Sequence, residues 1–369
     1  MTQAAAPWQP RWSGRRLARL ASWVAIGLSL SLVVLVVAGT ALLREYDSNI
    51  TRLPGVIDAQ PPPDRDSQPL NVLLVGSDSR EGLTGAEAFQ GTGRGFITGE
   101  RSDVVILAHL SADRQRAELV SIPRDSYVDI PAFQDPDTGE QRPSRRSRLN
   151  TAFNLGGPPL LVDTVQQLTG LQLQHYVQVD FRGFRGLVDR LGGVEICLNE
   201  AQEDFRSGID LKAGRQTVGG EQALAFVRQR AGLAGGDVGR IERQQLLLGA
   251  LVREVLSAGT LLNPRRLNGV LQVVTGSLQV DQTLTADRLQ QLALSLRGLQ
   301  PDAVAFTTAP IGDLAARRAG ASVVLLDVAA SERLFDRLGR DLPRPAPPPP
   351  AAGEPPPRDA RTAAENVCT

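Results

Sequence analysis

Long apolar runs bounded by turn-forming residues predict strands in the middle of the chain. Runs rich in β-branched residues cover 71–76 (NVLLVG), 103–110 (DVVILAHL) and 117–122 (AELVSI), and the last two are expected to form a hairpin through 111–116. Further strands are expected at 175–181, 194–198 and 303–308. Continuous apolar runs of this kind are typical of strands that are covered on both faces.

Amphipathic segments between and after these strands predict helices. They lie at 160–168 and 182–191, where Gly192 and Gly193 end the second one, and then at 222–230, 238–256, 265–274, 286–296 and 331–339. Because strands alternate with helices, the expected fold class is a layered α/β domain. The strand at 303–308 is expected to rejoin the sheet.

An uncharged apolar segment, residues 20–43, is long enough to cross a bilayer as a helix, roughly 36 Å at 1.5 Å per residue. The residues before this segment include four arginines and no acidic residue among them: Arg11, Arg15, Arg16 and Arg19. Acidic residues follow it, so the positive-inside rule places the amino terminus in the cytoplasm and the later residues outside the cell membrane. A cleaved signal peptide is the alternative, but its apolar region is usually shorter.

These features divide the chain into expected parts. They are a cytoplasmic basic tail (1–19), a transmembrane helix (20–43), a Pro-rich tether (44–69), an extracytoplasmic domain (70–341) and a Pro-rich C-terminal tail (342–369). The tail carries a polyproline-type run over 342–357 that is not expected to join a core.

Composition excludes several classes of function. The chain has 40 basic and 40 acidic residues, so a basic site has to come from local clustering. It contains no P-loop, G-x-S-x-G, H-E-x-x-H or CxxC pattern, and no DNA-binding motif, so nucleic acid is not an expected partner. The two histidines, His109 and His175, lie inside predicted strands and are expected to be structural.

Acids and arginines just past the strand ends are the first candidate chemistry. Asp78 follows the first strand in GSDSR, Arg101 and Asp103 open the second in RSD, and Arg124 and Asp125 follow the third in SIPRD. The edge of an α/β sheet is a usual place for a site, and two carboxylates there can hold Mg²⁺ with substrate phosphate oxygens. The alternative is that these acids pair with neighbouring arginines.

A second cluster lies around the glycine-rich stretch after residue 227. Its members are Arg228, Arg230, Asp237, Arg240, Arg243 and Gln244. Arg228 and Arg230 can converge only if the preceding helix ends near Val227. Arg240 and Arg243 share a face in the first turn of the next helix, where the macrodipole disfavours cations, so an anion such as pyrophosphate is expected there. The alternative is an ion-pair network with Asp237, Glu242 and Glu221.

A third basic stretch, QRPSRRSR at 141–148, holds four arginines and no acid. The preferred interpretation is a solvated loop. The alternative is a contact with lipid headgroups or an anionic glycan.

The sequence resembles the LytR-CpsA-Psr family, the wall-glycopolymer ligases of Gram-positive and some other bacteria, over about residues 70–257. The resemblance rests on motifs that occur in the family's order: NVLLVGSDSR, RSDVVILAHL, LVSIPRDSYVDIP, SRLNTAFNLGG, GFRGLVDRLGGVEICL, GGEQALAFVRQR and GDVGRIERQQ. It implies a three-layer α/β/α domain with a central mixed sheet and an apolar tunnel for a polyprenyl chain.

The resemblance also implies an activity and roles for residues. The activity is Mg²⁺-dependent transfer of a glycan phosphate from a polyprenyl-pyrophosphate carrier to a peptidoglycan hydroxyl. Asp78 and Asp103 would bind Mg²⁺, and Asp237 would assist deprotonation of the acceptor. The pyrophosphate would be held by Arg101, Arg124, Arg148, Arg228, Arg230, Arg240 and Gln244, with Arg124, Arg228 and Arg230 also stabilising the transferring group.

Two further points follow from the resemblance. The loop at 81–100 is longer than the family commonly has, which bears on the placement of Asp78 relative to Asp103. A disulfide between Cys197 and Cys368 would fit actinobacterial-type members, the alternative being two unpaired thiols. The other functions considered are a pyrophosphatase that uses water as acceptor and a non-catalytic lipid-glycan binder or envelope regulator.

Overall fold

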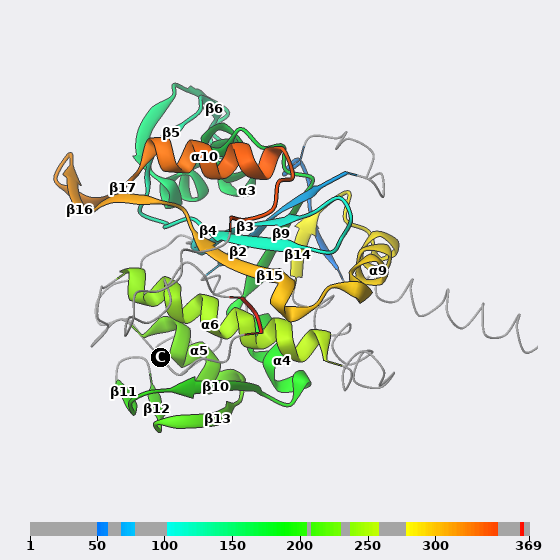
Figure 1. Ribbon diagram of the computed structural model, residues 1–369. Helices are drawn as coiled ribbons and strands as arrows, with labels where there is room; N and C mark the ends of the chain where they lie inside the picture. The colour runs from blue at the N-terminus through cyan, green and yellow to red at the C-terminus, as the bar shows by residue number, and fades with distance from the viewer. Residues whose placement is uncertain are drawn as a thin grey trace, which may run out of the picture. The chain divides into compact units, whose positions relative to one another are not determined.

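A seven-stranded mixed sheet forms the centre of the fold (Figure 1). The computed structural model describes residues 50–57, 68–77, 102–204, 208–229, 237–257, 278–345 and 362–364. In spatial order the strands are β1 (Thr51–Leu53), β14 (Leu278–Asp281), β9 (His175–Asp180), β2 (Leu70–Ser77), β3 (Ser102–Leu110), β4 (Ala117–Ser121) and β15 (Val304–Thr308). The predicted strands at 71–76, 103–110, 117–122, 175–181 and 303–308 are all confirmed in this sheet.

The directions of the strands determine which strand ends lie at the same edge of the sheet. β2 is parallel to β9, and β4 is parallel to β15, whereas β3 runs antiparallel to both β2 and β4. The predicted β3–β4 hairpin is confirmed, and the Ser111 amide donates to the Arg116 carbonyl at 3.0 Å to close its turn. The carboxyl ends of β2, β4, β9 and β15 and the amino end of β3 therefore lie at one edge, which we call the site edge.

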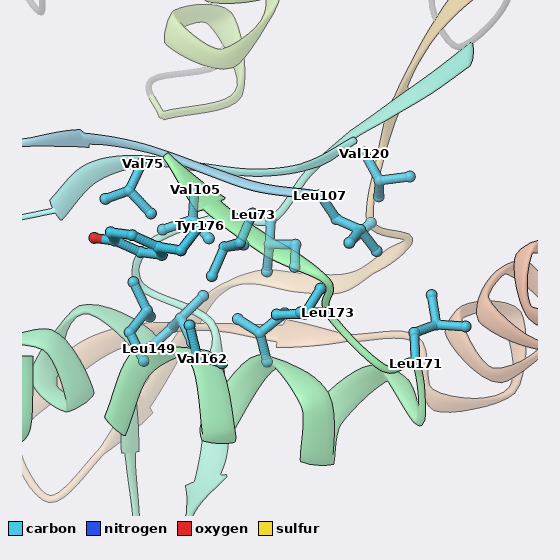
Figure 2. Packing of buried hydrophobic residues seen from close by; sticks show 14 of the residues in the cluster. Leu73, Val75, Val105, Leu107, Val120, Leu149, Val162, Leu171, Leu173 and Tyr176 are labelled. Carbon is cyan, nitrogen blue, oxygen red and sulfur yellow. The ribbon is translucent and has the colours of Figure 1, made fainter. Parts of the chain in front are cut away.

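Side chains of β2 alternate between two helical layers, as a strand with both faces buried requires. Leu73 and Val75 pack on one face, and Leu70 and Val72 on the other. The first face is covered by α3 (Leu149–Thr169) and α10 (Val328–Gly339), the second by α6 (Asp237–Leu256) and α9 (Ala286–Ser295). Figure 2 shows Leu73 and Val75 facing Leu149 and Val162 of α3. The expected layered α/β architecture with a central mixed sheet is confirmed.

The helix expected at 160–168 is longer than predicted. α3 begins at Leu149 and runs to Thr169, with a kink at Gly157, whose φ of 64° and ψ of −157° are not helical. Pro158 and Pro159 follow the kink, where missing amide donors are tolerated because a new helical turn begins. The GGPP sequence indicates a break, but both sides bury apolar residues in the core, and packing keeps them in one helical segment.

A second cluster of apolar residues is built by α4 (Phe181–Leu191), α5 (Gly220–Arg228), α6 and the small hairpin described next. The predicted strand at 194–198 is confirmed as β10 (Val194–Leu198), but it pairs with β13 (Gly214–Val218) and not with the central sheet. Two glycines, Gly193 and Gly220, permit close packing of the chain in this cluster. A Cβ on Gly193 would lie 2.6 Å from Thr217 Cγ2, and one on Gly220 would lie 2.4 Å from the Arg185 carbonyl oxygen.

Four further hairpins were not predicted from the sequence. They are β5–β8 (Tyr127–Ile130 with Arg145–Arg148), β6–β7 (Phe133–Gln134 with Gln141–Arg142), β11–β12 (Gln202–Asp204 with Ile209–Leu211) and β16–β17 (Ile311–Arg318 with Ala321–Leu326). Most of these strands are short or largely solvent-exposed and lack the apolar runs by which buried strands are recognised, whereas β17 contains the apolar run VVLL, which the sequence prediction missed.

Described segments outside the expected 70–341 domain also pair with the sheet. The compact unit extends from Asn49 to Thr369. β1 lies within the expected tether and pairs with β14. Thr362 pairs with Ala305 at the outer edge of β15, and Ala363 is fully buried. The physical reason is that β14 and β15 would otherwise have open edges, on which short segments can pair.

Several expectations fall outside the described residues. They include the transmembrane helix at 20–43, the helix at 265–274, most of the C-terminal tail and Cys368. Among the helices that the structure describes, none combines the length and the apolarity needed to span a membrane. Cys197 is buried on β10, and its pairing with Cys368 stays a prediction.

Candidate functional site

The site edge brings together the strand ends that precede or follow the candidate residues. Ser77 of β2 is paired with Ser102 of β3 on one side and with Asp180 of β9 on the other. Ser121 of β4 is paired with Thr308 of β15. Ligands in α/β folds bind outside the carboxyl ends of the strands, so this edge is the expected position for a site.

A β-bulge marks the point where β3 enters the sheet. Gly76 pairs with Val104 but Ser77 pairs with Ser102, so Asp103 is the additional residue of the bulge. A Cβ on Gly76 would lie only 3.1 Å from Val104 Cβ, which explains the glycine at this close approach. Bulges of this kind redirect a side chain at the rim of a sheet. The backbone of Asp103 therefore lies at the site edge, while its side chain and Asp78 and Arg101 lie outside what the structure describes.

Two serine hydroxyls beside the bulge lack hydrogen-bond partners. Ser77 and Ser102 are both fully buried, and their Oγ atoms are among the buried polar atoms of the described residues that make no hydrogen bond. An unsatisfied buried hydroxyl costs free energy unless a ligand or water completes it. The two hydroxyls fit a polar ligand at this end of β2 and β3.

Arg124 and Arg148 are brought together by one carboxylate. Arg124 follows β4, and Arg148 ends β8 immediately before α3. Asp125 Oδ2 lies 3.5 Å from Arg124 Nε, and Asp125 Oδ1 lies 3.5 Å from Arg148 Nη1. Asp125 is therefore paired with neighbouring arginines, which was the alternative expected for the acids at the strand ends. The two arginines are among the predicted pyrophosphate ligands.

Arg228 lies at the end of α5, which stops near Val227 as the convergence of the arginines requires. The next residue, Gln229, leaves the helical conformation with φ −56° and ψ 134°. The Arg228 guanidinium lies 4.9 Å from the centre of the Phe181 ring. Phe181 directly follows Asp180, the last residue of β9, so the stacking holds Arg228 near the site edge. Arg230 lies outside the described residues.

α6 is attached to the site edge by Gln245. Its Nε2 donates to Ser121 Oγ at 3.1 Å, to the Thr307 carbonyl at 3.3 Å and to Thr308 Oγ1 at 3.1 Å. Arg240 is nearly fully buried on the same helix, and Gln244 is half-buried one turn later. These contacts bring the amino-terminal half of α6 to the ends of β4 and β15. Asp237 begins α6, but its side chain is not described.

Arg243 contacts other side chains of the protein, although its spacing from Arg240 suggests a shared anion. Its guanidinium lies over the Phe226 ring at 4.8 Å and donates to Gln229 Oε1 and to Gln202 Oε1, at 2.5 and 2.8 Å. Burial lowers the pKa of Arg243 from its ordinary value. The side chain therefore braces the end of α5, which carries Arg228.

The basic stretch at 141–148 is divided between two environments. Arg142 pairs with Asp135 at 3.1 Å, and Arg146 pairs with Asp129 at 3.0 Å and lies over the Tyr127 ring. These arginines are exposed, in agreement with a solvated surface. Arg148 differs because it contacts Asp125, and it alone of the stretch is linked to the site edge.

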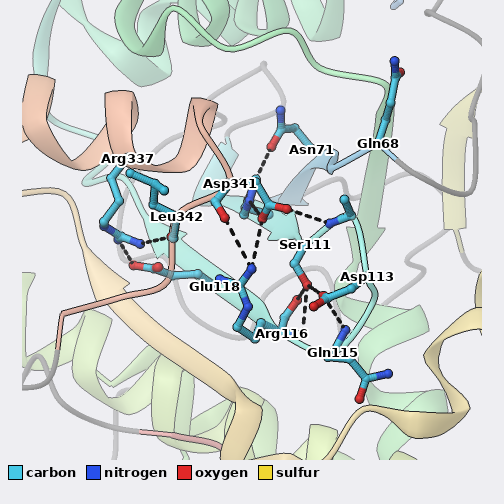
Figure 3. A network of polar contacts seen from close by, with 12 residues as sticks. Gln68, Asn71, Ser111, Asp113, Gln115, Arg116, Glu118, Arg337, Asp341 and Leu342 are labelled. Carbon is cyan, nitrogen blue, oxygen red and sulfur yellow. Dashed lines mark hydrogen bonds and ion pairs between the residues drawn. The ribbon is translucent and has the colours of Figure 1, made fainter.

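Both histidines are structural, as predicted. His109 Nδ1 lies 2.7 Å from Asn71 Oδ1, and His109 Nε2 lies 3.3 Å from Asp341 Oδ1. Asn71 and His109 are paired at the end of the sheet opposite the site edge, and Figure 3 shows the polar network around Asp341 and Asn71. Burial lowers the pKa of His109 below its ordinary value. His175 Nδ1 lies 3.1 Å from the buried carboxylate of Asp281.

Four residues of the site were not singled out by the sequence: the unpartnered Ser77 and Ser102, and the contact-making Phe181 and Gln245. Each has an unremarkable residue type and is recognisable only from its position in the fold. For Phe181 a signal existed, since an aromatic residue directly after a strand end can stack on an arginine. For the others no pattern in the sequence distinguishes them.

The fold and this edge define a class: an α/β protein with a mixed central sheet and an arginine-rich site outside its strand ends. Residues 41–338 match the family described as the LytR_cpsA_psr family. The chain belongs to the LytR-CpsA-Psr family, and the resemblance seen in the sequence is confirmed.

Named relatives agree with this assignment, and solved structures agree with the fold. The chain is 36% identical over 323 residues to the probable cell wall biosynthesis protein LcpB of Corynebacterium glutamicum, covering 87% of this chain and 71% of LcpB. It is 32% identical over 230 residues to the polyisoprenyl-teichoic acid–peptidoglycan teichoic acid transferase TagU of Enterococcus faecalis, covering 62% of this chain and 66% of TagU. The fold is similar to the LytR-Csp2A-Psr enzyme from Actinomyces oris, with a TM-score of 0.59, 22% identity, and coverage of 79% of this chain and 96% of that one.

Proposed function

We propose that this protein is a phosphotransferase that attaches a wall glycopolymer to peptidoglycan, taking it from a polyprenyl-pyrophosphate carrier. The observation that carries the proposal is the gathering of guanidinium groups from separate segments at one sheet edge. Arg124 and Arg148 meet at Asp125, and Arg228 is stacked at the end of β9. Guanidinium forks match phosphate oxygens, and several together suit a diphosphate.

Family membership supports the type of reaction. TagU is named as a teichoic acid transferase acting on peptidoglycan, and one similar fold is described as TagT bound to LI-WTA, with a TM-score of 0.56 and 22% identity, over 79% of this chain and 99% of that one. We infer the same reaction class for this chain. The glycopolymer itself stays open.

The reaction balances as an in-line substitution at phosphorus. An acceptor hydroxyl oxygen of peptidoglycan forms a bond to the glycan-side phosphorus, and the bond from that phosphorus to the bridging oxygen breaks. Polyprenyl phosphate leaves with the bridging oxygen, and the hydroxyl proton passes to a base, for which Asp237 is the candidate. Arg124, Arg148, Arg228 and Arg240 hold the diphosphate and stabilise charge on the oxygens of the transferring group.

The residues at the bulge fit a divalent cation. Asp103 lies in the bulge, and the fully buried Ser77 and Ser102 beside it have unpartnered hydroxyls that can bind water around an ion. Asp78 and Asp103 would hold Mg²⁺, which when bound would neutralise charge on the diphosphate oxygens. Arg101, Arg230 and Gln244 complete the proposed set. Membrane anchoring through residues 20–43 and an apolar tunnel for the polyprenyl chain belong to the same proposal.

The test is a reconstituted transfer. The purified protein is mixed with a polyprenyl-pyrophosphate-linked glycan, peptidoglycan and Mg²⁺, and the phosphodiester-linked product is measured by mass spectrometry. Product is expected from the wild type, with at least about a hundredfold less from Arg228→Ala. Asp129→Asn, on a neighbouring surface pair, is the matched control and is expected to be active. Release of polyprenyl phosphate at the same rate without acceptor would instead identify a pyrophosphatase.

A further inference from the structure

The carboxylate of Asp125 joins two arginines that come from different elements. Arg124 precedes it in the loop after β4, and Arg148 lies at the junction of β8 and α3. Each carboxylate oxygen takes one of them, Oδ2 facing Arg124 and Oδ1 facing Arg148, both at 3.5 Å. The Asp125 and Arg124 side chains are 23% and 15% exposed, so this pair is shielded from bulk water more than a surface ion pair is, whereas Arg148 is 44% exposed and reaches the solvent.

The backbone around Asp125 is fixed from both sides. The Arg124 carbonyl accepts from the Asn150 amide at 2.9 Å, and the Ser126 carbonyl accepts from the Leu149 amide at 2.8 Å. The Asp125 carbonyl itself accepts from the Val324 amide of β17 at 2.9 Å. The loop is therefore held by the first residues of α3 and by the β16–β17 hairpin, and the Asp125 side chain starts from a defined position.

Two guanidinium groups at one site repel each other and are mobile on long side chains. A carboxylate between them offsets the repulsion and restricts both, and the trio keeps a net charge of +1. Preorganisation of this kind lowers the entropy lost when an anion binds. A carboxylate near an anion site also has an opposite effect, because it repels the anion. The two roles predict changes of opposite sign when the charge is removed.

We propose that Asp125 is a positioning residue, which sets the spacing of Arg124 and Arg148 for the diphosphate group of the substrate. The inference rests on the proposed function, since it names how the same site is ordered. Asp125 acts through the arginines and does not itself touch the reacting atoms. Val324 and the β16–β17 hairpin belong to this device because they hold the loop from the side opposite α3.

The experiment measures binding of inorganic pyrophosphate to the full-length protein by calorimetry, at fixed Mg²⁺ and ionic strength. Asp125→Asn is expected to weaken binding about tenfold, because both arginines lose their common partner. Asp129→Asn is the matched control. Asp129 faces Arg146 at 3.0 Å across the same pair of strands, β5 and β8, and its removal is expected to leave pyrophosphate affinity unchanged.

A double-mutant cycle separates positioning from a general loss of structure. In an Arg148→Ala background, Asp125→Asn is expected to have a clearly smaller effect than in the wild type, and Asp125→Glu is expected to restore part of the affinity. Thermal midpoints of all variants identify any that fail to fold. If Asp125→Asn does not fold, the same cycle is measured with Asp125→Glu in the wild-type and Arg148→Ala backgrounds.

The outcomes distinguish the two proposals. Equal or tighter pyrophosphate binding by folded Asp125→Asn would overturn the positioning role and leave the proposed function intact. Absence of pyrophosphate binding by the wild type would overturn the proposed function and the positioning role with it.

Discussion

Asp281 is the carboxylate whose removal should cost the most stability outside the site. It is fully buried at the end of β14 and accepts hydrogen bonds at both oxygens. Oδ2 accepts from the Tyr176 amide at 3.0 Å and faces His175 Nδ1 at 3.1 Å, while Oδ1 accepts from the Thr283 amide at 2.9 Å and from the Thr283 hydroxyl. The carboxylate therefore joins β9 to β14 and to the turn that follows.

Asp281→Asn keeps the shape but replaces one oxygen by an NH₂ group. That group faces donors, so a buried backbone amide loses its acceptor, at about 1–3 kcal/mol, and a second hydrogen bond of about 1 kcal/mol is lost or rearranged. The expected loss in free energy of unfolding is about 2–4 kcal/mol, and the melting temperature should fall by about 4–8 °C. Urea unfolding followed by circular dichroism measures both.

The control is Asp287→Asn, an exposed acid in the first turn of α9, which should cost less than about 1 kcal/mol. The pH dependence is a second readout. Burial acts to raise the pKa of Asp281, but hydrogen bonds from His175, Thr283 and Tyr176 outweigh it and the pKa lies below its ordinary value. A lowered carboxyl pKa stabilises the fold above the unfolded value, 3.8, and that contribution is lost as the pH falls below it. The wild-type advantage over Asp281→Asn should therefore shrink in acid. A variant within about 0.5 kcal/mol of the wild type at neutral pH would refute the reasoning.

Three further predictions concern other contacts. Phe181→Leu removes the ring under Arg228 and should weaken pyrophosphate binding severalfold in calorimetry with little change in melting temperature; an unchanged affinity would show that the ring does not position the guanidinium. Arg253→Met removes the donor to the Ala363 carbonyl at 2.7 Å, and faster amide exchange at Ala363 is expected, whereas equal protection would contradict the contact's role. Burial lowers the pKa of His109, so the unfolded chain takes up a proton before the folded protein does as the pH falls below 6.5, and the free energy of unfolding should drop there. The His109→Asn variant should lack this pH dependence, and a pH profile parallel to that of the wild type would contradict the prediction.

The strands of the central sheet were predictable because they are buried on both faces. The β-branched runs at 71–76, 103–110 and 117–122 need no knowledge of partners to be recognised. The helical end near Val227 was predictable as well, since the glycines after it cannot continue a stable helix. The order of the strands in the sheet could not be predicted from the apolar runs or from the glycines. β9 pairs with β2 through a crossover that only tertiary packing fixes.

The site divides in the same way. Arg124 and Arg228 could be chosen from the sequence because arginines after strand and helix ends are chemically conspicuous. Their spacing could not, since it depends on Asp125 and on the ring of Phe181, contacts between segments far apart in the chain. Arg243 shows the reverse case. Its helical spacing from Arg240 suggested a shared anion, but the Phe226 ring and two glutamine side chains hold it in a bracing position.

The short contact of residues 362–364 with β15 has a practical consequence for anyone preparing this protein. The outermost strand presents unpaired backbone groups wherever that segment is missing, and exposed strand edges promote association between molecules. Trimming the chain before the proline-rich region, a natural choice for crystallisation, would remove this cover as well. Preparations that end at Pro345 should therefore self-associate more readily than those that keep the last residues.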